Sequence, residues 1–135
     1  MKIQSQPSRR IQIVAALITD IEGQILLVRK RGTRYFMQPG GKAEPDETAE
    51  ETLAREILEE LGCAIRPDSI RYKGRFVAEA ANEPDHEVDA AIFKVEILGE
   101  PIAQAEIAEL VWLKVNNPEG LMLAPLTRDH VLPLA

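Results

Sequence analysis

The segment from Asp46 to Leu61 constrains the fold most strongly, because it predicts an amphipathic helix whose polar face is acidic. At about 100° per residue, its apolar and acidic side chains separate onto opposite faces. The expected buried face comprises Ala54, Ile57, Leu58 and Leu61. The expected solvent-facing carboxylates are Glu56, Glu59 and Glu60. No other stretch of the chain has a comparably strong helical pattern.

The ends of this helix have recognisable signals. Asp46 is the expected N-cap, since a side-chain oxygen there can accept from the first backbone N–H groups. Glu47 and Glu50 favour the first turn through the helix dipole. Gly62 is the expected stop, because glycine adopts the left-handed conformation that ends many helices.

The acidic side chains are unusually concentrated along this segment. Residues 44–60 contain eight acids in seventeen positions, and Arg55 is the one basic residue among them. The i, i+3, i+4 spacing of Glu56, Glu59 and Glu60 places three mutually repelling carboxylates on one face. A fully solvated face tolerates that arrangement. It also suits a hard divalent cation, since Mg²⁺ prefers carboxylate oxygens and leaves positions open for substrate phosphates.

The overall charge narrows the class of partner. The chain of 135 residues has 22 acids against 16 bases and a formal charge of -6. A basic nucleic-acid-binding protein is therefore disfavoured. An acidic chain can still bind an anionic substrate when a cation lies between the two.

The remaining pattern predicts strands around the helix. Residues 11–19 and 24–30 indicate two apolar strands joined by a turn, and we expect them to form a hairpin. Further strands are expected at 70–80, 88–98 and 110–114, with an acidic turn at 81–87 and a short helix near 126–132. Strands on both sides of one dominant helix indicate a mixed α/β domain.

Residues 41–63, GKAEPDETAEETLAREILEELGC, resemble the Nudix box. That pattern is Gly, five residues, Glu, seven residues, Arg-Glu, an aliphatic residue, any residue, Glu-Glu, any residue, Gly and an aliphatic residue. The positions that match it without insertion are Gly41, Glu47, Arg55, Glu56, Ile57, Glu59, Glu60 and Gly62. Cys63 takes the final aliphatic place, where it can pack as a small apolar side chain.

This resemblance extends over residues 10–132 and implies a Nudix-type α/β/α sandwich with a mixed central sheet. We expect residues 1–135 to form one such domain, similar to the small MutT-like members. The implied function is metal-dependent hydrolysis of a nucleoside diphosphate linked to another group. A nucleoside triphosphate cleaved to a monophosphate and pyrophosphate is the favoured substrate. An ADP-ribose or nucleotide-sugar pyrophosphatase, and a nucleotide-binding regulatory module without turnover, are the alternatives.

The resemblance also implies roles for individual residues. Glu56, Glu59 and Glu60 would hold Mg²⁺ or Mn²⁺, with Gly41 and Glu47 as further candidate ligands. Arg55 would pair with Glu47 and orient the loop before the helix. The residues expected in catalysis are Glu59, Glu60, Glu56, Arg55 and Glu106.

The general base and the phosphate contacts are less closely defined. A base needs only hydrogen-bond reach to the attacking water, and the candidates are a box glutamate or a later one, Glu106 or Glu109, with Glu106 favoured. Lys42, Arg34 and Arg29 are the candidate phosphate-binding residues, within or near a basic loop that also contains Lys30 and Arg31.

The expected location is the cytoplasm. Cys63 is the one cysteine, so no intramolecular disulfide can form. Residues 1–10 are polar and do not resemble a signal peptide, and the apolar run at 11–18 is far shorter than the ~20 residues that span a bilayer. We expect a small-molecule nucleotide as partner, no nucleic acid or membrane, and a monomer or homodimer.

Overall fold

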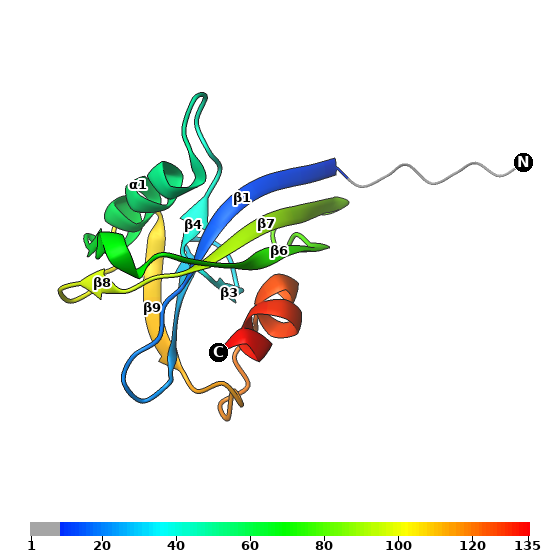
Figure 1. Cartoon of the computed structure of the whole chain (residues 1–135). Coiled ribbons are helices and arrows are strands. Elements are labelled where there is room, and N and C mark those ends of the chain that lie inside the picture. Colours follow the sequence, from blue (N-terminus) through cyan, green and yellow to red (C-terminus); the bar gives the residue numbers. More distant parts are fainter. Residues whose placement is uncertain (1–8) are drawn as a thin grey trace, which may run out of the picture.

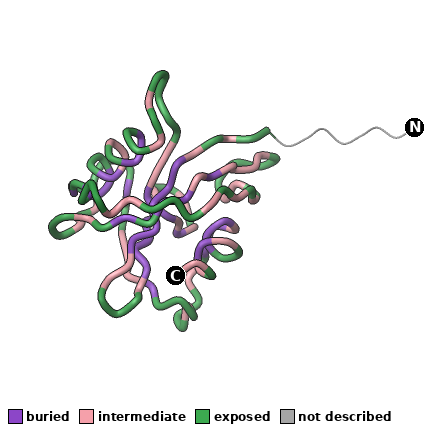
Figure 2. The backbone as a smooth tube through the Cα atoms, viewed as in Figure 1, coloured by how far each residue is buried: buried purple, intermediate pink, exposed green. Residues whose placement is uncertain are grey.

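The computed structural model describes residues 9–135. Residues 1–8 lie outside the described residues. The prediction made for residues 1–10, that they do not resemble a signal peptide, falls mostly on this part. The first half of β1 (Arg9–Leu17) is exposed or half-buried, whereas its C-terminal half and most of β2 (Ile25–Lys30) are among the most buried parts of the described chain (Figures 1 and 2). Their continuous apolar sequence is explained by cover on both faces.

Alternate residues of these strands enter two separate cores. Val14 and Ala16 of β1, with Leu26 of β2, pack in the core beneath the helix. Ala15 and Leu17 pack in the second core, beneath the C-terminal helical segment. Because successive side chains of a strand point to opposite faces, each strand is sandwiched between the two helical layers. The α/β/α arrangement expected from the sequence is therefore confirmed.

The strands form a mixed set of sheets. Strand β1 pairs in parallel with β7, whereas the other neighbours are antiparallel. One sheet has the order β4-β1-β7-β6, another β3-β2-β9, and a small third pairs β5 with β8. The bounds of these strands are β3 Phe36–Met37, β4 Gly40–Gly41, β5 Ala64–Ile65, β6 Arg71–Glu79, β7 His86–Lys94, β8 Ile97–Leu98 and β9 Ile107–Leu113.

Two strand predictions were wrong in part. The expected hairpin of 11–19 and 24–30 pairs only beside its turn, at Thr19 and Ile25, and the strands then join different sheets. They diverge because each finds a longer partner, β1 along β7 and β2 along β9. The expected strand 88–98 divides into β7 and β8, since β8 leaves the main sheet to pair with β5.

Helix α1 (Ala49–Leu61) begins later than expected. Thr48, and not Asp46, is its N-cap, and the Thr48 hydroxyl accepts from the backbone N–H of Glu51 while the Glu51 carboxylate accepts from that of Thr48. This reciprocal capping box satisfies two N–H groups, whereas Asp46 has a left-handed backbone with φ of 67° in the preceding turn. Gly62 ends the helix with φ of 70°, as predicted.

The buried face of α1 is rotated from the predicted one. Leu53, Ile57 and Leu61 are fully buried, whereas Leu58 is 57% exposed. Ala54 is also exposed. Glu60, expected in solvent, is only 2% exposed. The helix packs on β1 and β4 along the Leu53–Ile57–Glu60 line, so the sheet, rather than the apolar pattern, decides which carboxylate is covered.

The rest of the chain completes the second layer. A 3-10 turn, η1 (Pro67–Ser69), follows β5, and the chain ends in a π-helical turn, η2 (Thr127–Val131), and a 3-10 turn, η3 (Leu132–Leu134). These last turns confirm the position of the short helix predicted near 126–132. Across the described residues 9–135, no helix is both long and apolar enough to cross a membrane.

The rotated face of α1 gives a stability test. Leu53→Ala opens a cavity under the helix, and we expect it to lower the free energy of unfolding by about 2–5 kcal/mol. Leu58→Ala changes an exposed side chain and is expected to stay within about 0.5 kcal/mol of the unsubstituted protein. Urea unfolding measures both. Equal costs for the two variants would contradict the observed helix orientation.

Candidate active site

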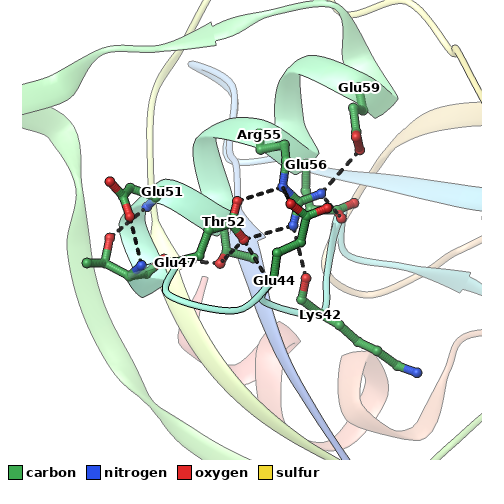
Figure 3. A network of polar contacts seen from close by, with 9 residues as sticks. Lys42, Glu44, Glu47, Glu51, Thr52, Arg55, Glu56 and Glu59 are labelled. Carbon is green, nitrogen blue, oxygen red and sulfur yellow. Dashed lines mark hydrogen bonds and ion pairs between the residues drawn. The ribbon is translucent and has the colours of Figure 1, made fainter.

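Arg55 is the centre of a carboxylate network on α1 (Figure 3). Its guanidinium donates to the two oxygens of Glu47 at 2.7 and 3.0 Å, and to Glu56 Oε2 at 2.8 Å. It also reaches the carbonyl oxygen of Lys42 at 3.0 Å and Glu59 Oε1 at 3.4 Å. One cation thus joins the loop before the helix to two helical turns.

Glu47 holds the loop in place. Its Oε1 accepts from the backbone N–H of Glu44 at 2.8 Å and from the Thr52 hydroxyl at 2.8 Å, in addition to Arg55. Hydrogen bonding by Arg55, with that of the Glu44 N–H, lowers the pKa of Glu47 from 4.5 to about 2. Since the folded-state pKa is depressed, this carboxylate stabilises the fold fully above pH 4.5. The contribution is lost as the pH falls toward about 2.

Glu60 lies at the joint between the helix and the Gly40–Gly41 strand. Its Oε1 accepts from the backbone N–H of Gly40 at 3.1 Å, and within residues 9–135 it forms no ion pair. Burial raises the pKa of Glu60 from 4.5 to about 8, and the nearby charges of Glu56 and Glu106 add to that rise. The Gly40 N–H and the charge of Lys30 oppose it. A buried carboxylate with so little compensation is one that a cation would stabilise.

Gly41 allows the Glu56 carboxylate to lie against the backbone. A Cβ atom at this position would stand 2.6 Å from Cδ of Glu56, closer than real Cβ contacts. The match of Gly41 to the expected pattern therefore has a steric reason, because any side chain would displace Glu56.

One cavity of about 530 Å³ adjoins these residues. Of the predicted site residues, those that line it are Gly41, Lys42, Arg55, Glu56, Glu60 and Glu106. Its other walls come from β1, β2 and β7 and from the 80–83 segment, part of which belongs to the predicted acidic turn. The carboxylates thus share a cavity with the apolar side chains of Ile11, Ile13, Val28, Met37 and Val88.

The structure places the remaining candidates elsewhere. The Arg29 guanidinium donates to Glu109 at 2.8 Å and to the carbonyl oxygen of Thr33, so it is held outside the cavity lining. Arg34 is exposed, and neither it nor Glu59 lines the cavity. Glu47 also lies outside the lining, behind Arg55.

Two polar lining residues beyond the chosen site candidates bear on the chemistry, Lys30 and Gln38. Lys30 lies in the expected basic loop, and its Nζ is 3.8 Å from Glu106 Oε2. Gln38 is a buried amide in the cavity wall. The available signal for Gln38 was a polar residue between Met37 and Pro39 in an otherwise apolar stretch.

The donor set fits a hard divalent cation by its chemistry. Glu56, Glu60 and Glu106 face the same cavity, and all three offer carboxylate oxygens, which Mg²⁺ and Mn²⁺ accept. Within residues 9–135, no three His, Cys, Asp or Glu side chains already stand at metal-holding spacing. Arg55 donates to the carboxylates of Glu56 and Glu59 in this arrangement.

Comparison with known proteins identifies the family. The chain matches the NUDIX domain model over residues 9–134, so it belongs to the Nudix hydrolase family. An uncharacterized Nudix hydrolase of Bacillus subtilis, YvcI, is 25% identical over 119 residues, which cover 85% of this chain and 73% of that protein.

Two further similarities are to a solved structure and to a second relative. The crystal structure of a MutT protein from Methanosarcina mazei Go1 has a TM-score of 0.73 and 25% identity, with 96% of this chain and 95% of that chain covered. An 8-oxo-dGTP diphosphatase of Haemophilus influenzae is 41% identical over 56 residues. That match covers 38% of this chain and 41% of the Haemophilus protein, less than half of either.

The network around Arg55 predicts how the loop responds to substitution. Glu47→Ala removes the acceptor for the Glu44 N–H and the main partner of Arg55. We therefore expect faster amide hydrogen exchange at Glu44 and earlier proteolytic cleavage within 42–47. Glu44→Ala is the matched control, because that carboxylate is largely exposed and 3.9 Å from Arg55. Unchanged exchange in Glu47→Ala would contradict the role given to this contact.

Proposed function

We propose that this Nudix hydrolase cleaves a nucleoside triphosphate to a nucleoside monophosphate and pyrophosphate, with Mg²⁺ or Mn²⁺. The observation that carries the proposal is one cavity lined both by carboxylates and by apolar side chains. The carboxylates suit a polyphosphate that is bound through a cation, and the apolar side chains suit a nucleoside. The name of the Haemophilus relative supports a nucleoside triphosphate as substrate.

Glu56 and Glu60 are the proposed principal ligands, because they line the cavity beside Gly41. Glu59 is proposed as a third, since its one contact is the long 3.4 Å approach to Arg55, which it can leave. Gly41 remains a candidate ligand through its backbone. Glu47 we assign to positioning, since Arg55 binds both its oxygens. When bound, the cation neutralises phosphate oxygens and lowers the pKa of water.

The chain's own residues would then orient the substrate and move the proton. Lys30 and Lys42 lie on the cavity and can contact the phosphate oxygens. Water attacks a phosphorus atom, the bridging P–O bond breaks, and the water proton passes to a carboxylate. We propose Glu106 for this step, because it lines the cavity, whereas Glu109 is paired with Arg29.

The metal ligands can be tested by one conservative substitution. Glu60→Gln keeps the shape of the side chain but removes the carboxylate that would bind the cation. We therefore expect kcat to fall about a hundredfold or more. The melting temperature near neutral pH should change little, since a carboxyl group with a pKa of about 8 is mostly uncharged there and the amide oxygen of Gln can still accept from the Gly40 N–H. Phosphate release from a nucleotide panel with Mg²⁺ or Mn²⁺ gives the rates. Glu50→Gln, on an exposed turn of the same helix, is the control.

Full activity in Glu60→Gln would overturn the proposed metal site. A collapse of the melting temperature would instead indicate that Glu60 is structural. Absence of turnover on every nucleotide by the unsubstituted protein would overturn the proposed reaction.

The general base can be assigned by comparing two nearby glutamates. Glu106→Gln removes the proposed proton acceptor, and we expect kcat to fall by about 10²–10⁴-fold. Glu109→Gln breaks only the ion pair with Arg29 and should leave kcat within about threefold. Rates measured across pH separate loss of a base from altered binding. The reverse order of effects would move the role to Glu109.

A further inference from the structure

Gln38 has an unusual environment for a side-chain amide. It lies between β3 and β4 and is 6% exposed. Its Oε1 accepts from the Thr127 hydroxyl at 3.0 Å. Its Nε2 has no hydrogen-bond partner, and within residues 9–135 it is the only buried side-chain nitrogen or oxygen atom in that condition.

An unpartnered buried donor is costly, so it requires an explanation. An apolar side chain of similar length would fill the same space without leaving an N–H group unsatisfied. The Thr127 hydroxyl holds the amide oxygen and thereby leaves the nitrogen free to donate. An acceptor from outside the chain would complete this arrangement.

The surroundings of Gln38 indicate what that acceptor belongs to. Gln38 lines both the main cavity and a small adjoining recess of about 60 Å³. Ile13, Met37 and Val88 also line both, and apart from Gln38 and the exposed Glu79 the recess is lined by apolar residues. The carboxylates of Glu56 and Glu60 belong to the main cavity alone. A mainly apolar recess with one unpartnered amide donor, Gln38 Nε2, suits a flat heterocycle whose edge bears a hydrogen-bond acceptor.

We propose that Gln38 Nε2 donates a hydrogen bond to a ring keto oxygen of the substrate's base. The protein would then select keto bases over their amino counterparts, because an amino group would face the amide donor with a second donor. This inference deepens the proposed nucleotide hydrolysis and rests on it. Thr127 acts as a positioning residue through the amide oxygen.

Binding of nucleoside monophosphates tests the proposal without turnover. Calorimetric titration compares inosine with adenosine monophosphate and uridine with cytidine monophosphate, each pair differing at one keto or amino group and in the protonation of the adjacent ring nitrogen. We expect about tenfold tighter binding of the keto member in each pair. Gln38→Met should reduce that ratio to about one, with a melting temperature at or above that of the unsubstituted protein.

Two further variants separate the amide from general effects. Gln12→Met makes the same substitution at an exposed glutamine of β1 and should keep the keto preference. Thr127→Val frees the amide to rotate, and we expect an intermediate ratio. Equal binding within both pairs, or a preference that survives in Gln38→Met, would overturn the proposal. Keto-selective binding that is lost in Gln38→Met supports the proposed base contact, whether or not any nucleotide is hydrolysed. Absence of hydrolysis would overturn the proposed reaction alone.

Discussion

The contact between Arg55 and Glu47 is the interaction on which the acidic wall of the cavity depends. It ties the loop at 42–47 to the first turns of α1, and the same guanidinium holds Glu56 and reaches Glu59. A cation within the chain therefore compensates a helix face that would otherwise repel itself. Of the carboxylates on this helix that line the cavity, Glu56 is paired with Arg55, whereas Glu60 forms no ion pair within residues 9–135.

The cavity combines two kinds of surface because of how the layers meet. Strand β1 is covered by α1 on one face and by the C-terminal turns on the other. The cavity lies where Gly40–Gly41 brings this strand close to Glu60. Carboxylates from the helix and apolar side chains from the strands are thereby placed around one cavity.

Much of the candidate site was predictable because it is local. Gly41, Arg55, Glu56 and Glu60 keep a spacing that a helix and its preceding loop convert directly into proximity. Gly62 ended the helix as expected for the same reason. The helix face was less predictable, since Ala54 and Leu58 follow the apolar pattern and yet are exposed.

The sequence by itself determined the family and the spacing of the carboxylates, because both depend on residues 41–63, which form one helix and the loop before it. Only the tertiary structure decided which carboxylate is buried, because that depends on the sheet packed against α1. It also turned Arg29 toward Glu109 and brought Lys30 to the cavity. The contact of Gln38 with Thr127 joins residues 89 positions apart, and no local pattern can specify a pairing made by two separate layers.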